Sequence, residues 1–433
     1  MLKFKTVRGM RDFLPEEART LRYVEDAAQK VAELYGFNEI ITPTVESYEL
    51  LAAKSGEEIR SRMFAFRDLG NREVALRPEF TASVARLVAT TLRNEPKPLR
   101  LFNVGSVYRY DEPQNGRYRE FWQSNYELIG TSKPEADAEI LMLTDTLMRT
   151  VGLKNHAFRI GHIGILRGIF SQEGLSENDQ SAIMQLMDKK QYENALTLAA
   201  EKGVSEKGVA VLQSLVEFKG NATSKVVERI MNIVKDYEAA VDATDNLAKI
   251  LDLIRKSGYT LDVTIDAGFA RGLEYYTGMI FEVYVYESNL ALGGGGRYDR
   301  LVELFGSEST PAVGVAHGID RIMLALQKQQ KQCIKNIGGV AIIPTTEGLK
   351  PEALRIARML REAGIPAEAE VMGRKMAKAL EAADKRSLDF ALIIGEKELK
   401  DGAVVIKDLR KREQKIVKIE KIIVTIKNAP HEN

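Results

Sequence analysis

The chain opens with the pattern of an amphipathic helix. Apolar residues recur at helical spacing from Ala18 to Leu34, Pro15 and two glutamates precede them, and Gly36 follows. Proline and acidic residues favour the first turn of a helix, and glycine favours the position after its end. The pattern therefore predicts a helix over Pro15–Leu34.

Strand-like segments dominate the rest of the first third of the chain and return near residue 260. They are rich in β-branched and aromatic residues and end at Gly or Asp-Glu-Pro turns. The segments are 40–45, 101–110, 121–129, 261–266 and 279–286. They follow one another more often than they alternate with helices, which predicts an α+β fold with a mostly antiparallel sheet flanked by helices. Pro43 cannot donate to a strand ladder, so its strand is expected at an edge or an interface.

The composition and the hydrophobic pattern of the sequence change between residues 165 and 258. Segments 176–186, 192–202 and 226–234 are helical in pattern, charged and poor in aromatic residues. We therefore expect a helical insertion at 165–258, which separates a first part of the sheet domain at 1–164 from a second part at 259–326.

A Gln- and Lys-rich run at 327–336 is the expected linker to a further domain at 337–433. Beyond it, strand and helix patterns alternate, which is typical of a compact α/β domain of about 95 residues. The expected strands are Val340–Pro344, 367–371, Phe390–Ile394 and a hairpin-like pair at 403–409 and 415–426. The expected helices are 349–363 and 375–385.

Composition limits the class of protein. The 433 residues are 45% hydrophobic and 28% charged, as in a soluble protein of several domains. No uncharged apolar run reaches 18 residues, so we expect no membrane span. Cys333 is the only cysteine, which rules out a disulfide framework and fits the reducing cytoplasm. Residues from Asn336 onward carry 19 Lys and Arg against 15 Asp and Glu, an excess compatible with either a nucleic-acid contact or a solvated face.

A segment around Arg109 carries the first candidate chemistry. Arg109 ends one predicted strand, a polar loop follows, and the chain returns through Gln123 to Glu127. Such a hairpin could present arginine, glutamine and glutamate on one sheet face, although charged residues on a hairpin are more often a solvated face. No Gly-x-x-x-x-Gly-Lys-Ser/Thr phosphate loop occurs, so any bound ATP would need side-chain cations around its phosphates.

Several motifs resemble those of the class II aminoacyl-tRNA synthetases. Arg109-Tyr110-Asp111 with Phe121 beyond the loop resembles motif 2, although the family usually has glutamate in place of Asp111. The segment 314–321, which ends in Arg321 and enters a helix, is similar to motif 3. The Pro43 strand lies where motif 1 would form a dimer interface.

Two further segments narrow the resemblance to the histidyl-tRNA synthetase family. The run 270–278 (Ala-Arg-Gly-Leu-Glu-Tyr-Tyr-Thr-Gly) and the run 294–299 (Gly-Gly-Gly-Arg-Tyr-Asp) look like its two histidine-specific motifs, and 76–81 lies upstream in the expected order. The resemblance covers about residues 6–326. The last domain is similar to the anticodon-binding domain of the same family, notably at 395–398 and 405–409.

The resemblance implies a two-step ligase reaction. L-histidine and ATP would form histidyl-adenylate and pyrophosphate, and the histidine would then move to the 3′ end of its tRNA. The implied partners are L-histidine, ATP, Mg²⁺, the tRNA for histidine and a second copy of the chain in a homodimer.

The same resemblance assigns roles to the two ends of the site. Arg109 and Arg271 would be catalytic, with Arg109 on the α-phosphate and Arg271 bridging that phosphate and the substrate carboxylate. Arg117, Arg321 and Asp111 would contact the rest of ATP. The expected histidine-binding residues are Glu79, Phe80, Thr81, Arg109, Gln123, Glu127, Arg271, Tyr275, Tyr276 and Tyr298.

Within that set, the substrate's chemistry suggests a division of labour. Glu79, Thr81 and Gln123 can accept hydrogen bonds from a cationic α-amino group. Glu127 and Tyr276 can serve the two imidazole nitrogens, each of which needs its own partner. Phe80 stands where the family often has a small residue or methionine.

Three alternatives remain open. One is the histidine-sensing regulatory subunit of ATP phosphoribosyltransferase, which shares the catalytic fold but generally lacks the C-terminal domain and the full arginine set. The others are a tRNA-binding or sensor module without turnover, and a class II synthetase for another amino acid. The presence of Arg271 and of a complete C-terminal domain favours the histidine enzyme.

Overall fold

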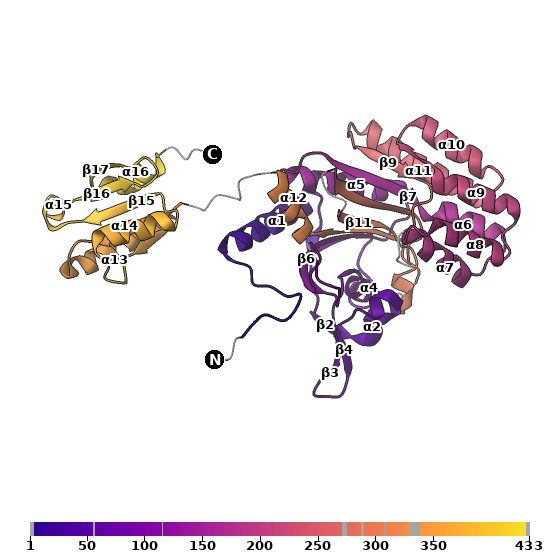
Figure 1. The fold of residues 1–433 in the computed structure, drawn as a ribbon, viewed down its shortest axis with the longest axis horizontal. Helices are drawn as coiled ribbons and strands as arrows, with labels where there is room; N and C mark the ends of the chain where they lie inside the picture. The colour runs from indigo at the N-terminus through magenta and orange to yellow at the C-terminus, as the bar shows by residue number, and fades with distance from the viewer. Residues whose placement is uncertain are drawn as a thin grey trace. The chain divides into compact units, whose positions relative to one another are not determined.

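The chain divides into two compact units, Met1–Cys333 and Ile334–Asn433. The computed structural model describes residues 4–54, 57–114, 116–270, 275–286, 290–306, 308–329 and 338–429 (Figure 1). Among these residues, no helix has the length and apolar composition needed to cross a bilayer.

A large sheet organises the first unit. Within the described residues it has nine strands in the order β1-β5-β6-β12-β11-β10-β7-β9-β8. The strands are β1 (Asn38–Glu39), β5 (Leu99–Tyr108), β6 (Glu120–Ile129), β7 (His156–His162), β8 (Lys219–Asn221), β9 (Val263–Asp266), β10 (Met279–Val285), β11 (Ala291–Arg297) and β12 (Ala312–Gly318). All neighbours from β5 to β7 pair antiparallel, and only β1 with β5 and β7 with β9 are parallel. The predicted α+β class is confirmed.

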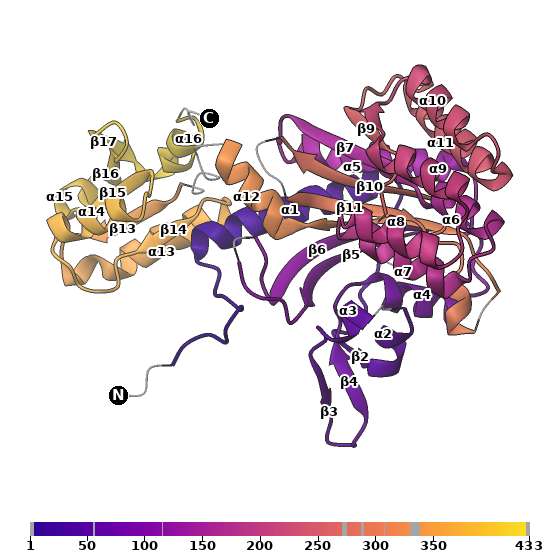
Figure 2. The ribbon, with the colours of Figure 1, turned by 45° about the vertical axis from the view of Figure 1, so that its right-hand side comes forward.

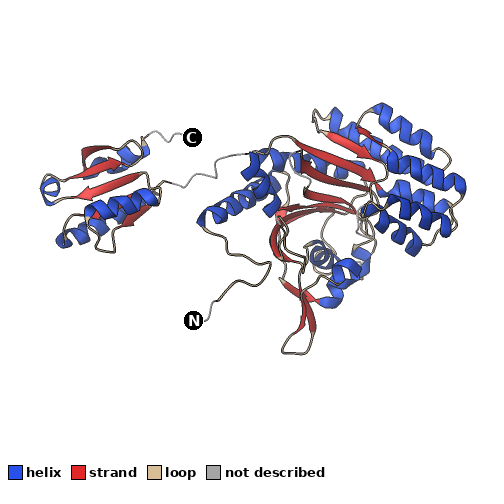
Figure 3. Cartoon of the chain, in the orientation of Figure 1, coloured by secondary structure: helices blue, strands red, loops and turns tan. Residues whose placement is uncertain are grey.

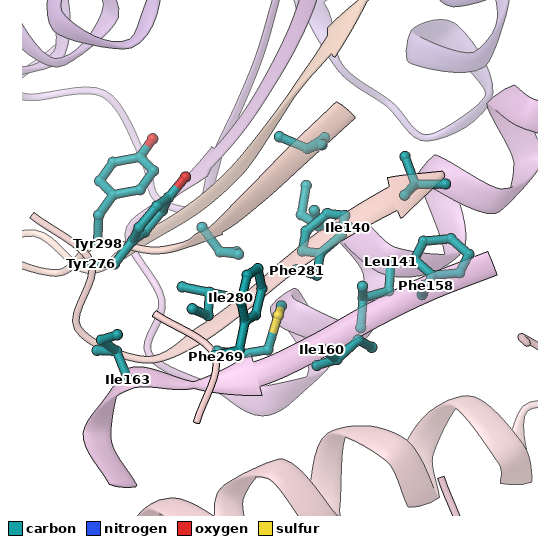
Figure 4. Close-up of a cluster of buried hydrophobic side chains, with 14 of the residues drawn as sticks. Ile140, Leu141, Phe158, Ile160, Ile163, Phe269, Tyr276, Ile280, Phe281 and Tyr298 are labelled. Atoms are coloured by element: carbon teal, nitrogen blue, oxygen red, sulfur yellow. The ribbon is translucent and has the colours of Figure 1, made fainter. Parts of the chain in front are cut away.

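One face of the sheet is covered by helices. Helix α1 (Pro15–Leu34) has the predicted bounds and packs with α5 (Pro134–Thr150) and α12 (Ile319–Gln329) against the sheet. Figure 4 shows part of the core between sheet and helices, where Leu141 of α5 lies near Phe158 and Phe281 of the strands. Full burial of side chains of this size stabilises the fold by about 1.5–3 kcal/mol each. The opposite face of β6, β12 and β11 is therefore the one available to ligands.

The insertion is mostly helical, as predicted. Its helices are α6 (Ile163–Gln172), α7 (Glu177–Asp188), α8 (Tyr192–Glu201), α9 (Glu206–Glu217), α10 (Ser224–Val234) and α11 (Glu238–Lys256), which stack beside β7 and β9 (Figure 2). Three begin at hydroxyl caps, where Ser176, Ser205 and Thr223 accept a backbone N–H from the first turn. The short strand β8 within this region pairs with β9, so the insertion also extends the central sheet.

The predicted strand at 40–45 is wrong. Strand β1 ends at Glu39, and β2 (Val45–Ser47) belongs to a separate small sheet with β4 (Glu73–Leu76) and β3 (Ala65–Arg67). In between, the Arg77 guanidinium donates to the carbonyl oxygen of Thr42 at 2.7 Å, and the Arg77 N–H donates to that of Thr44 at 2.9 Å. Ile40 still donates to the Phe102 carbonyl and Val45 begins β2, so Arg77 holds the stretch between the two ladders. Helices α2 (Tyr48–Lys54), α3 (Glu57–Arg60) and α4 (Thr81–Ala89) complete this part of the fold.

The second unit is an α/β domain with one five-stranded sheet among its described residues (Figure 3). The strands, in the order β14-β13-β15-β16-β17, are β13 (Val340–Pro344), β14 (Ala367–Ala369), β15 (Phe390–Ile394), β16 (Ala403–Asp408) and β17 (Glu413–Lys418). The helices are α13 (Lys350–Glu362), α14 (Met376–Lys385), α15 (Glu396–Lys400) and α16 (Ile422–Lys427).

The prediction of a strand over the whole of 415–426 is wrong in its second half. Strand β17 ends at Lys418, and α16 buries Ile422 and Ile426 against the core of the second unit. These two residues are four positions apart, so they lie on one face of a helix, whereas the run of β-branched residues between them suggested a strand. Helix α12 also continues to Gln329, three residues into the expected linker.

Two buried histidines should make the stability of the fold depend on pH. His317 on β12 is fully buried, with its Nε2 3.2 Å from the Thr144 hydroxyl, and His162 is buried at the start of α6. Burial lowers the pKa of His317 to about 3 and that of His162 to about 4. In the unfolded chain a histidine takes up a proton near pH 6.5, so acid favours unfolding as the pH falls below that value.

Replacing His317 with glutamine should flatten this acid dependence. Between pH 6.5 and 4.5, the H317Q variant is expected to lose about 2 kcal/mol less unfolding free energy than the parent chain. Urea denaturation at the two pH values measures the difference. Equal losses in the two proteins would show that His317 does not stay neutral in the fold.

Candidate active site

A cavity of about 590 Å³ lies on the open face of the large sheet, beside β6, β12 and β11. It brings together segments that are far apart in the sequence, from the start of α4 to the start of α12. Most of the residues predicted for the site line it: Glu79, Thr81, Arg109, Asp111, Arg117, Gln123, Glu127, Tyr275, Tyr276 and Arg321.

The floor of the cavity is made of residues with little or no side chain. Gly294 of β11 pairs with Ala316 of β12, and Gly314 of β12 pairs with Glu127 of β6. A Cβ atom at Gly314 would overlap the Glu127 carboxylate. The glycine run 293–296 therefore belongs to a strand, and it leaves room for a ligand on a flat floor.

Glu127 is a buried and firmly held polar group of the cavity wall. It is 1% exposed, and its carboxylate accepts hydrogen bonds from Asn125 Nδ2 at 2.8 Å and from the Tyr298 hydroxyl. Burial and the neighbouring Glu127 charge raise the pKa of Tyr298 well above its ordinary value, so the hydroxyl stays protonated and donates. The carboxylate is thus fixed in place before any ligand arrives.

Tyrosines form the wall next to Glu127. The Tyr275 ring lies 4.7 Å from that of Tyr276 and 5.8 Å from that of Tyr298, measured between centroids. Figure 4 shows the rings of Tyr276 and Tyr298, whose hydroxyl oxygens point away from the apolar cluster around Phe281. Tyr298 is predicted as a binding residue, but it does not line the cavity; its hydroxyl donates to Glu127, which does line it.

Acceptors for a cation lie along the same wall. The Glu79 carboxylate accepts the backbone N–H groups of Thr81 at 2.6 Å and Ala82 at 3.0 Å, which places it at the start of α4. Gln123 is 8% exposed, and its Oε1 has no hydrogen-bond partner within the described part of the chain. A buried acceptor of this kind gains from a ligand that donates to it.

Phe80 does not line the cavity, contrary to the expectation. Its ring is 1% exposed and lies under the Arg77 guanidinium, whose carbon is 4.4 Å from the ring centroid. Phe80 supports the chain segment that carries Glu79 and Thr81, and it does not itself limit the size of the cavity.

Cations gather at the other end of the cavity. Arg109 Nε donates to the Pro78 carbonyl at 2.9 Å, and the guanidinium carbon lies 5.4 Å from the Phe121 ring centroid. Arg321 at the start of α12 donates to the Ala291 carbonyl at 2.7 Å. These contacts fix two planar donor groups at the cavity, one of them beside an aromatic ring, an arrangement suited to a nucleotide.

Asp111 forms ion pairs with two arginines that line the cavity. Its buried carboxylate lies 2.8 Å from Arg117 Nε and 3.3 Å from an Arg62 Nη. An ion pair of this kind orients Arg117 at the cavity wall. Sequence reasoning missed Arg62, because nothing in its surroundings in the sequence marks it as a site residue.

Other residues of the wall also escaped the sequence reasoning. Tyr118 directly follows Arg117 and could have been included from that position alone. Glu282 of β10 and Asp188 at the end of α7 also line the cavity, and neither lies in a recognisable motif. Asp188 shows that the helical insertion contributes to the site.

A second cavity of about 650 Å³ shares part of its lining with the first. The two share Arg117, Asp188, Glu282, Ala291 and Arg321. The second adds aromatic residues and two further cations: Tyr192, Phe269, Tyr284, Tyr286, Arg159 and Lys190.

The model of the family described as histidyl-tRNA synthetase matches residues 9–322, and that of the anticodon binding domain matches residues 339–429. The chain belongs to the histidyl-tRNA synthetase family. A protein of Methanocaldococcus jannaschii named histidine–tRNA ligase is 42% identical over 98% of this chain and 99% of its own length. The protein of the same name from Pyrococcus furiosus is 37% identical and covers 98% of each chain.

Solved structures agree with this family. The histidyl-tRNA synthetase of Nostoc sp. PCC 7120 covers 99% of both chains with a TM-score of 0.83 at 25% identity. A Bacillus halodurans protein described as ATP phosphoribosyltransferase regulatory subunit/histidyl-tRNA synthetase covers 91% of this chain and 99% of its own, with a TM-score of 0.78 and 26% identity. The family and the fold predicted from the sequence are confirmed.

One predicted catalytic residue of the family's motifs is not placed by the structure. Arg271, with the rest of 271–274, lies outside the described residues. Ala270 on one side lines the second cavity, and Tyr275 on the other side lines the first.

Proposed function

We propose that the first cavity binds L-histidine and ATP side by side and joins them, so that the chain is a histidine–tRNA ligase. The observation that carries this proposal is a fixed carboxylate and tyrosines at one end of a single cavity, with arginines at the other. Relatives at about 40% identity over nearly the whole chain bear the same name, which favours the ligase over the regulatory alternative. Histidine-dependent exchange of pyrophosphate into ATP tests the proposal.

The first chemical step is an in-line displacement at phosphorus. A carboxylate oxygen of histidine attacks the α-phosphate of ATP, the bond to the bridging oxygen breaks, and pyrophosphate leaves. Negative charge on the α-phosphate oxygens must be stabilised during this step. We assign this stabilisation to Arg109. Arg271 keeps its role of bridging the histidine carboxylate and the α-phosphate as part of the proposal.

Histidine recognition is assigned to the fixed wall. Glu127 accepts one imidazole N–H, Tyr276 serves the other ring nitrogen, and Glu79, Thr81 and Gln123 receive the α-amino group. An apolar competitor would leave these buried polar groups unpaired, which can give roughly 10⁴- to 10⁵-fold rejection without editing.

ATP binding is assigned to the cationic end. The adenine would lie against Phe121 and Arg321, and Arg117 would contact the outer phosphates with Asp111 holding it in place. Within the described residues, no group of three His, Cys, Asp or Glu side chains could hold a metal ion by itself. Mg²⁺ commonly binds through one or two carboxylates plus substrate phosphates, and Glu282 and Asp188 of the cavity wall fit that role.

The second step requires the 3′ end of tRNA to enter the same site. Its ribose hydroxyl attacks the carbonyl carbon of the adenylate, and AMP leaves. The second cavity combines aromatic rings with cations, which suits unpaired nucleotides, so we assign the entry of the 3′ end to it. Because tRNA charging serves protein synthesis, we also place the protein in the cytoplasm.

The second unit is proposed to read the tRNA. Amino-acid activation involves no polynucleotide, and none of the proposed catalytic residues lies beyond Arg321. Ending the chain after Gln329 should therefore leave histidine-dependent exchange within a few-fold of the full chain and strongly weaken tRNA charging. It should also flatten the salt dependence of tRNA binding, since fewer phosphates are neutralised.

The truncated protein must first be shown to be folded and of unchanged oligomeric state. With that control, an equal loss of exchange and charging would refute the division of labour. Unchanged charging would show that the second unit is not the tRNA reader.

A homodimer is proposed from the segment that contains Pro43. Ile41 is 91% exposed, and Val45 and Phe66 of the small sheet are 44% and 47% exposed. Large apolar side chains exposed at the surface favour an interface, and twofold symmetry is the commonest closed arrangement. Sedimentation at micromolar concentration should show twice the chain mass of 48.4 kDa. A single species at the chain mass would contradict the proposal.

A further inference from the structure

A buried ion pair lies directly behind the histidine end of the cavity. Arg297 at the end of β11 and Asp137 in the first turns of α5 have side chains that are 7% and 0% exposed. Arg297 Nε lies 3.1 and 3.0 Å from the two Asp137 oxygens, and its Nη2 lies 2.5 Å from Oδ2. Neither side chain lines the cavity, so neither has an assigned part in the reaction.

The rest of the Arg297 side chain is also fully engaged. Its Nη1 donates to the Thr131 carbonyl at 2.9 Å and to Asp299 at 3.2 Å, and its Nη2 donates to the Lys133 carbonyl at 3.3 Å. A planar guanidinium with several partners can adopt only one position. The end of β11 is thereby fixed relative to the start of α5.

Two cavity segments depend on that position. The Arg297 carbonyl accepts the Thr277 N–H at 2.8 Å, and the Asp299 N–H donates to the Thr277 hydroxyl at 3.0 Å. Thr277 follows Tyr276 directly, and Tyr298 follows Arg297 directly. The residue therefore lies at the junction of the chain segment that carries Tyr276 and the one whose Tyr298 holds Glu127.

We propose that Arg297, paired with Asp137, is a positioning residue for histidine, which sets the places of Tyr276 and of the Tyr298–Glu127 pair. The inference rests on the proposed function and adds a residue that touches neither substrate. A displacement of about 1 Å at such a wall can change the use of a ligand by up to roughly 10²-fold. Arg109 and Arg321 at the ATP end donate to the carbonyls of Pro78 and Ala291, so the effect should fall mainly on histidine.

The R297K variant tests the proposal in pyrophosphate exchange. Lysine keeps the charge but loses the planar fork, so KM for histidine should rise by roughly 10-fold or more, with KM for ATP within about 2-fold of the parent value. The matched control is R100K, since Arg100 forms a two-bonded pair with Glu139 on the same helix, at 2.6 and 2.9 Å, but joins it to β5. That variant should leave both KM values unchanged.

Two further variants separate positioning from simple loss of structure. T277V removes only the hydroxyl between the two segments and should raise KM for histidine by a few-fold in a folded protein, even if R297K does not fold. In the double variant R297K/Y298F, the rise in KM should be smaller than the product of the two single effects, because both act through Glu127.

The outcomes are distinct. A parent chain without histidine-dependent exchange would overturn the proposed function itself. An active parent, with both KM values raised equally or neither raised in R297K and T277V, would overturn only the role given to Arg297. Equal effects of R297K and R100K would show that the pair merely stabilises the fold.

Discussion

Replacement of Arg109 with alanine is expected to slow histidine-dependent pyrophosphate exchange by roughly 10²- to 10³-fold, the usual cost of removing a donor to developing charge. Arg109 lies in the cavity wall, and its Nε bond to the Pro78 carbonyl fixes the guanidinium before ATP binds. Loss of the hydrogen bond to Pro78 should cost the fold about 1 kcal/mol. The rate measured at saturating histidine and ATP checks the prediction.

Two further variants are compared with R109A in the same exchange assay. R109K retains the charge without the fork, so its rate should fall between those of the parent and R109A. R255A removes an exposed arginine of α11, which is paired only locally with Asp252 at 2.6 Å, and should not change the rate. A rate for R109A within a few-fold of the parent would rule out the assignment of Arg109 to the α-phosphate.

Replacement of Glu127 with glutamine should act on histidine and not on ATP. The carboxylate is buried, is held by Asn125 and Tyr298, and is assigned to an imidazole N–H. A hydrogen bond to a charged group contributes about 1.5–3 kcal/mol, so kcat/KM for histidine should fall by roughly 10- to 100-fold. KM for ATP should stay within about 2-fold, as measured by varying each substrate at saturation of the other.

The neutral variant Y276F is the comparison for E127Q. It removes an uncharged partner from the same wall, so its effect should have the same direction and be smaller. If E127Q raised KM for ATP as much as KM for histidine, Glu127 would not be the imidazole partner.

Three predicted site residues that line the cavity share one physical basis for their placement. Gln123 and Glu127 lie on β6 with an even spacing, and side chains at such positions point to the same face of a strand. Arg109 follows β5, the antiparallel neighbour of β6. Local alternation and pairing of adjacent strands therefore place these three residues at one cavity.

The residues that the sequence places wrongly or misses depend on contacts between distant parts of the chain, which the alternation of side chains along a strand does not reveal. Phe80 lies between two cavity residues, yet its ring turns inward under Arg77. Segment 40–45 has the composition of a strand, but in its middle the Arg77 side chain bonds to Thr42 where a neighbouring strand was expected. Arg62 and Asp188 reach the cavity from distant parts of the chain, which no local pattern predicts.

The most direct test of the central claim is pyrophosphate exchange into ATP by the purified full-length chain, measured with each of the twenty amino acids in turn. The account predicts exchange with L-histidine and none above background with the others, because the proposed roles of Glu127 and Tyr276 give each imidazole nitrogen its own hydrogen-bond partner. Exchange with a different amino acid, or no exchange with histidine, would contradict it.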